Sequence, residues 1–178
     1  MIKNLEKPNQ FVLDVDGVMT TGHFLYNSDG KSMKIFGPDD NDALSILKNF
    51  MNIRFITGDK KGFEISKKRI VDDMGYQLDL VSTIDRVKWI SSLYDLDSVV
   101  YMGDGIFDHL VMGSVGYSIA PFNADANAKK NADFVTSRSG GDRAVSEACI
   151  HLLEKYFKPI TEIISTGSGA EFSGGWVG

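Results

Sequence analysis

The chain has 178 residues, of which 43% are hydrophobic and 24% are charged, and its formal net charge is −5. This length suits one domain with a sizeable core, and the negative charge argues against a nucleic-acid partner, because phosphate backbones are bound by basic surfaces. A single cysteine, Cys149, excludes an internal disulfide. No segment has the apolar length of a signal peptide or a membrane span, so we expect a cytoplasmic protein with no membrane partner.

Short apolar strands alternate with helical patterns along the chain. The first strand, at 11–13, ends at two acids, and a hairpin leaves directly from that end: the β-prone runs 22–26 and 32–36 flank a Ser-Asp-Gly turn. We therefore expect the hairpin to overhang the acidic strand end. The remaining expected elements, in chain order, are a helix over 38–50, a strand over 53–56, a helix over 61–74, a strand over 77–81, a helix over 84–94, a strand over 98–102, a helix over 107–112, strands over 117–120 and 133–136, and a helix over 145–156.

Strand and helix alternate from 11 to 156, with the hairpin as the one interruption. This order predicts an α/β fold with a doubly wound parallel sheet. No insertion is long enough to form a cap domain. We expect one domain over 1–158, followed by a flexible Gly/Ser-rich tail over 159–178.

Acidic side chains stand at the end of the first strand. Asp14 and Asp16 leave the same side of an extended chain, because strand side chains alternate between faces. Two like charges about 4 Å apart repel by roughly 4 kcal/mol at an effective dielectric of about 20. The pair therefore predicts a bound cation or a shared proton, although an acid at a strand end also serves as a turn former or helix cap.

Two further strands end in polar groups. The strand over 98–102 leads into Gly103 and Asp104, with Asp108 four residues on, and the strand over 53–56 leads into Thr57 and Gly58. In parallel sheets ligands bind beyond the carboxyl ends of the strands. We therefore expect one site with up to four carboxylates and one hydroxyl.

These residues suit phosphoryl transfer. Oxygen ligands in an acidic cluster favour Mg²⁺, and a hydroxyl with free backbone amides at a helix start forms an anion site. A nucleophilic Asp14 would form an aspartyl-phosphate, while Asp16 would protonate the leaving oxygen and then activate water. Arg86 or Lys88 would balance the charge, and we favour Arg86 because it shares a helical face with Ile90 and Leu93.

The motifs resemble those of the haloacid dehalogenase superfamily. They are Asp14 to Thr20, Thr57-Gly58, a basic residue, and Gly103 to Asp108. The hairpin, the missing cap and the segment 140–147 narrow the resemblance to the capless branch typified by 3-deoxy-D-manno-octulosonate 8-phosphate phosphatase.

The resemblance implies a Rossmann-like fold and a Mg²⁺-dependent phosphatase that acts on a phosphorylated sugar acid. Asp14, the backbone carbonyl of Asp16 and Asp104 would hold Mg²⁺, with Asp108 supporting its water shell. Thr57 and the basic residue would contact the phosphate. The family also implies a homotetramer in which hairpins associate and a neighbour helps to close each site.

Several positions depart from the family pattern and bear on the substrate. Asp59 and Asp39 stand where octulosonate phosphatases carry arginine. The acid after Thr-Gly resembles the branch that acts on 2-keto-3-deoxynonulosonate 9-phosphates, so we expect a preference for the nine-carbon substrate. Besides Thr57 and Arg86, the candidate substrate-binding residues are Gly58, Asp59, Lys88, Asp39 and Arg69, the last from the basic cluster Lys67-Lys68-Arg69.

Three other functions use similar residues or the same fold. A receiver domain would pair its acids on the first strand and carry its phosphorylated aspartate alone on a central strand, whereas here the spaced pair is on the first strand and the central strand ends in Thr57. A non-catalytic tetrameric interaction module is disfavoured by intact Asp14 and Asp16. A phosphatase acting on another small phosphate ester remains an alternative.

Overall fold

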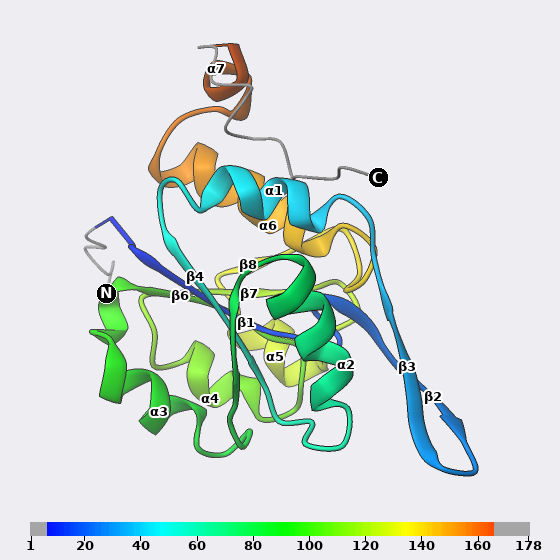
Figure 1. Cartoon of the computed structure of the whole chain (residues 1–178). Helices are drawn as coiled ribbons and strands as arrows, with labels where there is room; N and C mark the ends of the chain where they lie inside the picture. The colour runs from blue at the N-terminus through cyan, green and yellow to red at the C-terminus, as the bar shows by residue number, and fades with distance from the viewer. Residues whose placement is uncertain (1–6, 166–178) are drawn as a thin grey trace.

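The structure, a computed structural model, describes residues 7–165 (Figure 1). Its main sheet has six parallel strands, and β1 lies near the middle with its neighbours added on both sides. In spatial order the strands are β5 (Gln77–Leu80), β4 (Asn52–Thr57), β1 (Gln10–Asp14), β6 (Val99–Met102), β7 (Tyr117–Ala120) and β8 (Phe134–Val135). The chain first extends the sheet through β4 and β5, and then through β6, β7 and β8. This reversal opens a crevice at the carboxyl end of β1.

Helices cover both faces of the sheet (Figure 1). Along β1, Phe11 and Leu13 pack into one hydrophobic cluster and Val12 into the other, and all three are fully buried. Each buried side chain of this size contributes roughly 1.5–3 kcal/mol of transfer free energy. The first cluster contains residues of α1 (Asp40–Leu47) and α6 (Ala144–Tyr156), and the second contains residues of α3 (Arg86–Leu93), α4 (Asp108–Met112) and α5 (Ala126–Asn131). The predicted doubly wound α/β fold is confirmed.

The hairpin forms a separate antiparallel ribbon that projects from the body (Figure 1). Its strands are β2 (Thr20–Asn27) and β3 (Gly30–Phe36). Its turn is closed by the Asn27 side chain, which accepts a hydrogen bond from the Asp29 amide at 2.9 Å, and Gly30 has a φ of 121°, which suits glycine. The predicted hairpin is therefore confirmed, and no described element forms a cap domain.

Some elements differ from the sequence-based expectation. The single helix expected over 61–74 is α2 (Phe63–Lys67) followed by a π-helical turn, η1 (Lys68–Asp73). Helix α5 was not predicted, because only Ala128 of its six residues is buried and the segment lacks an apolar period. It begins where the Asp125 side chain accepts a hydrogen bond from the Asn127 amide at 2.8 Å. A short 3₁₀ turn, η2 (Leu96–Ser98), was also not predicted.

The described residues include the first part of the expected tail, 159–165. Helix α7 (Ile160–Ser165) occupies its first part, and Ile163 is buried against the core rather than lying in an irregular linker. The remainder of the expected tail, 166–178, lies outside the described residues. Across 7–165, every helix is too short or too polar to cross a membrane.

Candidate active site

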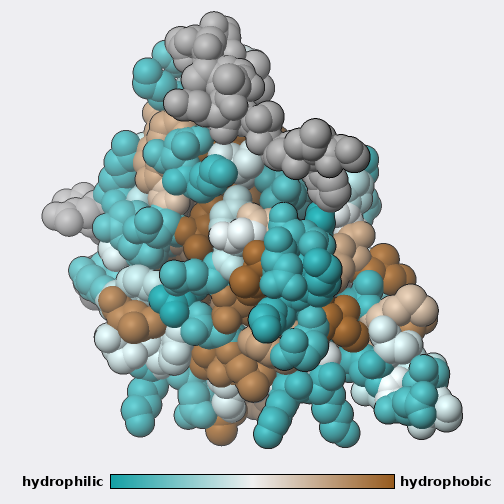
Figure 2. Space-filling view, viewed as in Figure 1, coloured by the Kyte–Doolittle hydropathy of each residue, from teal (hydrophilic) through white to brown (hydrophobic). Residues whose placement is uncertain are grey.

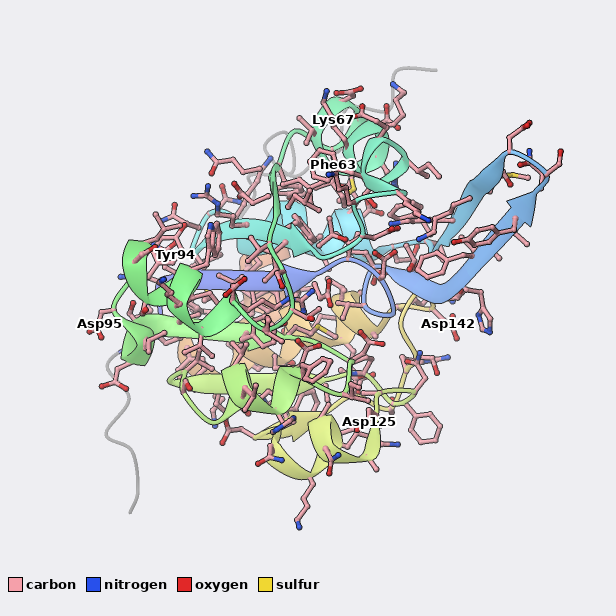
Figure 3. The ribbon with its side chains drawn as sticks, turned by 90° about the horizontal axis from the view of Figure 1, so that it is seen from below. Phe63, Lys67, Tyr94, Asp95, Asp125 and Asp142 are labelled. Atoms are coloured by element: carbon pink, nitrogen blue, oxygen red, sulfur yellow. The ribbon has the colours of Figure 1, made fainter. Side chains whose placement is uncertain are left out.

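The polar strand ends meet at one edge of the sheet. Asp14 is the last residue of β1, Thr57 is the last residue of β4, and Asp104 follows β6. Figure 3 looks at the molecule from below. The hairpin and Asp142 lie at this carboxyl end of the strands, and Tyr94 and Asp95 lie at the opposite end.

Asp14 is buried and held by two donors. Its Oδ1 accepts a hydrogen bond from the Val15 amide at 2.7 Å, and its Oδ2 accepts one from Arg86 at 2.7 Å. Burial raises the pKa of Asp14 to about 6, although the charge of Arg86 acts in the opposite direction. Arg86 thus favours the ionised form that a nucleophile requires, against the effect of burial, and the two donors fix the orientation of the carboxyl group.

Arg86 places a buried cation at the acidic cluster. It begins α3, is 2% exposed, and its Nη1 lies 2.7 Å from Asp14, from Asp108 and from the Tyr101 hydroxyl. Burial alone would lower the pKa of Arg86, but the surrounding oxygens raise it overall. Lys88, two residues further along α3, is exposed. The structure thus places Arg86 rather than Lys88 at the acidic cluster, as the helix phase indicated.

Three carboxylates fit a metal ion. Asp14, Asp104 and Asp108 each present an oxygen within 4.8 Å of the others. Burial, followed by the charges of Asp14 and Asp108, raises the pKa of Asp104 to about 8. Gly17 is required here, because a Cβ at this position would lie 1.9 Å from Asp104 Oδ2. A hard divalent cation suits this all-oxygen set and would favour the ionised carboxylates.

The Asp16 carboxylate turns to a different set of partners. Thr57 Oγ1 donates a hydrogen bond to Asp16 Oδ2 at 3.0 Å, and Lys34 Nζ lies 2.7 Å from Asp16 Oδ1. The two acids of the first motif therefore have different neighbours, although only one residue separates them in the chain. Asp14 belongs to the cluster with Arg86, and Asp16 lies beside the hairpin.

A cavity of about 280 Å³ joins these groups. Its lining combines the candidate nucleophile, the candidate proton donor, the buried cation and residues of the hairpin: Asp14, Asp16, Phe24, Lys31, Gly58, Asp59, Thr83 and Arg86. Thr57 lies beneath it, and its hydroxyl accepts a hydrogen bond from the Asp59 amide at 3.1 Å. The cavity suits a small charged group presented to Asp14.

Two hairpin lysines reach the site and were not predicted. Lys31 Nζ lies 2.5 Å from Asp59 Oδ2 and 3.3 Å from the centre of the Phe24 ring, and Lys34 Nζ lies 2.9 Å from the same Asp59 oxygen. Burial alone would raise the pKa of Asp59, but the hydrogen bonds from both lysines lower it to about 2. The available signal was a pair of cations on the second strand of the hairpin that follows the acidic strand end.

Three other expected binding residues do not line the cavity. Lys88 is exposed on α3, and Arg69 lies on η1. Asp39 is exposed and forms an ion pair with Arg143 at 2.5 Å, which links the starts of α1 and α6. Lys67 and Lys68 of the basic cluster lie near acids of their own segment, Glu64 at 3.8 Å and Asp73 at 2.9 Å.

A larger hollow of about 640 Å³ lies beside the edge strand β5. Its lining includes Arg54, Asp79 and two residues labelled in Figure 3, Phe63 and Lys67. It shares no lining residue with the strand-end cavity and holds none of the clustered carboxylates. The smaller cavity is therefore the candidate active site.

Known proteins resemble this chain along most of its length. No family model matches. A 3-deoxy-D-manno-octulosonate 8-phosphate phosphatase of Salmonella typhi is 30% identical over 152 residues, which are 80% of this chain and 77% of that protein. The cobalt-bound deoxy-D-mannose-octulosonate 8-phosphate phosphatase of Haemophilus influenzae is 25% identical, with a TM-score of 0.71, and covers 84% of this chain and 90% of its own.

A third comparison bears on the fold. The 3-deoxy-D-manno-octulosonate 8-phosphate phosphatase of Moraxella catarrhalis was solved in complex with magnesium, phosphate and a KDO molecule. It is 23% identical to this chain and superposes with a TM-score of 0.76, covering 92% of this chain and 95% of its own. The sequence relatives and the superposed folds agree with the motifs at the strand ends. The chain belongs to the 3-deoxy-D-manno-octulosonate 8-phosphate phosphatase family of the haloacid dehalogenase superfamily, and it is a phosphoric monoester hydrolase.

Proposed function

We propose that this protein hydrolyses the phosphate ester of a 2-keto-3-deoxy sugar acid in a Mg²⁺-dependent reaction that passes through an aspartyl-phosphate on Asp14. The observation that carries the proposal is the shared cavity, in which Asp14, Asp16 and Arg86 face one small volume. A nucleophile, a proton donor and a cation in one cavity are the groups that phosphate-ester hydrolysis by a carboxylate needs.

In the first step an Asp14 oxygen attacks phosphorus and the bond from phosphorus to the sugar oxygen breaks. Asp16 donates its proton to the departing oxygen, so that the sugar leaves as an alcohol. The Thr57 hydroxyl contacts a phosphate oxygen. The expected anion site of free amides at a helix start is not formed, because the Asp59 and Lys60 amides already donate to Thr57 Oγ1 and to the Gly58 carbonyl and α2 begins only at Phe63. Arg86, 2.7 Å from Asp14, keeps the nucleophile ionised and balances the incoming charge.

In the second step water attacks phosphorus and the bond from phosphorus to Asp14 breaks. Asp16, now a carboxylate, accepts the proton of the attacking water, and inorganic phosphate leaves. Bound Mg²⁺, held by Asp14 and Asp104 with Asp108 nearby, would neutralise charge on the phosphate. The cobalt-bound form of the relative from Haemophilus influenzae supports a divalent metal at this site.

The length of the sugar acid is the finer part of the proposal. The names of the relatives support the eight-carbon octulosonate 8-phosphate, whereas Asp59 was the reason to expect a nonulosonate 9-phosphate. Asp59 does line the cavity, but its Oδ2 is shared by Lys31 and Lys34. A carboxylate with these two partners has less capacity to accept hydrogen bonds from sugar hydroxyls. The nine-carbon preference therefore stays a prediction.

Phosphate release tests the proposal. Octulosonate 8-phosphate, nonulosonate 9-phosphate and glycerol 3-phosphate are compared with Mg²⁺ and with EDTA. We expect a sugar-acid phosphate to give the highest kcat/KM, EDTA to stop the reaction, and Asp14→Asn to abolish turnover while the circular dichroism spectrum is unchanged, since an amide does not attack phosphorus.

Three outcomes would contradict parts of this proposal. Glycerol 3-phosphate as the best substrate would overturn the substrate class. Asp14→Asn activity within a few-fold of the unmodified protein would overturn the covalent mechanism. No release from any ester would favour the non-catalytic interaction module.

A further inference from the structure

A buried lysine of the hairpin contacts the candidate proton donor. The Lys34 side chain, on β3, has no exposed surface. Its Nζ lies 2.7 Å and 3.0 Å from the two carboxylate oxygens of Asp16, 2.7 Å from Ser66 Oγ on α2, and 2.9 Å from Asp59 Oδ2. An ammonium group has three N–H donors, and here three partners use them.

These contacts fit a holding role rather than a substrate-binding role. Lys34 is not among the residues that line the cavity, whereas Asp16 is. Because Asp16, Ser66 and Asp59 together use its donors, Lys34 has none left for a phosphate oxygen. Its charge acts on the reaction through Asp16.

Asp16 depends on this contact for its orientation. Its other side-chain partner in the described part of the chain is the Thr57 hydroxyl, at 3.0 Å. In the proposed reaction that hydroxyl also contacts the phosphate, which leaves Lys34 as the side-chain partner of Asp16 that does not contact the phosphate. A proton donor must be held within hydrogen-bond reach of the departing oxygen, and a displacement of about 1 Å lowers the rate about 100-fold.

We propose that Lys34 is a positioning residue that holds the Asp16 carboxyl group for proton transfer to the leaving oxygen and, in the second step, from water. This inference rests on the proposed function, because it assigns Lys34 a part in that reaction. It also gives the hairpin a chemical role. The second strand of the ribbon, β3, returns towards the end of β1 and brings Lys34 to the second acid of that motif.

The leaving group of the substrate separates this role from a merely structural one. An alkyl oxygen needs a proton as it departs, whereas p-nitrophenolate leaves without one. The value of kcat/KM reports steps up to the release of the alcohol or phenol. Loss of positioning should therefore lower kcat/KM for an alkyl ester and leave that for p-nitrophenyl phosphate nearly unchanged.

The experiment compares Lys34→Met with the unmodified protein on both esters, each variant at its own pH optimum with saturating Mg²⁺. The alkyl ester is the better sugar-acid phosphate, or glycerol 3-phosphate if neither is hydrolysed. We expect kcat/KM to fall about 10–100-fold for the alkyl ester and less than about threefold for p-nitrophenyl phosphate. For p-nitrophenyl phosphate, kcat and KM should fall together, because hydrolysis of the aspartyl-phosphate by water also depends on Asp16.

Matched variants guard against a folding effect. Ser66→Ala removes one Lys34 contact but keeps the contact with Asp16, so it should leave the ratio of the two kcat/KM values unchanged. In an Asp16→Asn background, Lys34→Met should change kcat/KM for the alkyl ester by less than about threefold, because the two residues act as a unit. If Lys34→Met does not fold, Lys34→Arg keeps the charge at Asp16 and should show the same selective loss to a smaller degree.

Three other outcomes would contradict the role of Lys34, the proposed substrate or the proposed function. Equal losses on the two esters, or additive losses in the Asp16→Asn background, would overturn the role of Lys34 and leave the proposed function intact. If the unmodified protein hydrolysed p-nitrophenyl phosphate and glycerol 3-phosphate but neither sugar-acid phosphate, the proposed substrate would be wrong. The role of Lys34 could still be tested on these two esters. No hydrolysis of any ester by the unmodified protein would overturn both.

Discussion

Arg86 compensates two acids that the fold removes from water. Its guanidinium nitrogen lies 2.7 Å from both Asp14 and Asp108, and all three residues are buried. A buried ion pair adds little to stability over an apolar replacement of both partners. Removing one partner is different, because it leaves an uncompensated buried charge. Arg86, the proposed partner of the nucleophile, should therefore also stabilise the fold.

Arg86→Met should lower the free energy of unfolding by about 3–5 kcal/mol at neutral pH and abolish phosphatase activity. Urea denaturation without added metal measures the first effect. Lys88→Met is the matched control, since Lys88 is exposed on the same helix, and it should change the free energy of unfolding by less than about 0.5 kcal/mol. An Arg86→Met protein as stable as the unmodified one would show that the acids are compensated in another way.

The starts of α1 and α6 meet at a buried acid. Asp40, the first residue of α1, is 1% exposed, and its Oδ1 accepts a hydrogen bond from the Ser146 amide at 2.8 Å in the first turn of α6. Burial raises the pKa of Asp40 to about 6, although this hydrogen bond lowers it. Its Oδ2 has no hydrogen-bond partner within the described part of the chain. The hydrogen bond between Asp40 and Ser146 therefore links the two helices. Above the pKa of Asp40 the buried carboxylate is charged, and this lowers the stability of the folded protein.

Asp40→Asn should become progressively more stabilising, relative to the unmodified protein, as the pH rises from 4 to 7. Between the unfolded pKa of about 3.9 and the folded pKa of about 6 the folded state retains a proton that the unfolded state releases, so its stability falls with rising pH. An amide keeps the acceptor oxygen and does not ionise. We expect the difference in free energy of unfolding to grow by about 1–3 kcal/mol over this range.

Urea denaturation at several pH values measures this difference, with Asp42→Asn as the control on an exposed acid of the same first turn. A difference between Asp40→Asn and the unmodified protein that does not vary with pH would contradict the raised pKa.

The hairpin leaves apolar surface uncovered by the other described residues. The exposed side chains on it are Phe24, Leu25, Tyr26, Met33 and Ile35, between 38% and 64% exposed. Figure 2 shows hydrophobic surface on the side of the molecule where the hairpin leaves the body. A two-stranded ribbon is only marginally stable alone, and a patch of this kind marks an interface in many proteins.

We predict a homotetramer that buries this ribbon. Light scattering at micromolar concentration should give four times the chain mass of 19.6 kDa, and Tyr26→Lys with Met33→Lys should lower it. Asp29→Lys, at the tip of the turn, is the matched control for added charge. A monomer mass for the unmodified protein would refute the prediction.

The fold class and the proximity of Asp14, Asp104 and Asp108 at one sheet edge could be predicted from the sequence, because both depend on local patterns. Apolar runs that end in Asp14, Thr57 and Asp104 identify parallel strands, and parallel strands bring their carboxyl ends to one edge. Helix periodicity likewise favoured Arg86 over Lys88. Element boundaries were less certain: α5 escaped prediction because a short polar helix has no apolar period.

The cations that reach the candidate site depend on tertiary contacts and could not be predicted from the sequence. Lys34 meets Asp16 across 18 residues of chain, and Lys31 meets Asp59 across 28. No local pattern specifies these contacts, because they depend on the angle at which the ribbon leaves the main sheet. Asp39 is an expected site residue that lies elsewhere. It precedes α1, forms an ion pair with Arg143 and does not line the cavity. A strand end fixes where its own acids lie, but the packing of separate elements fixes which cations reach them.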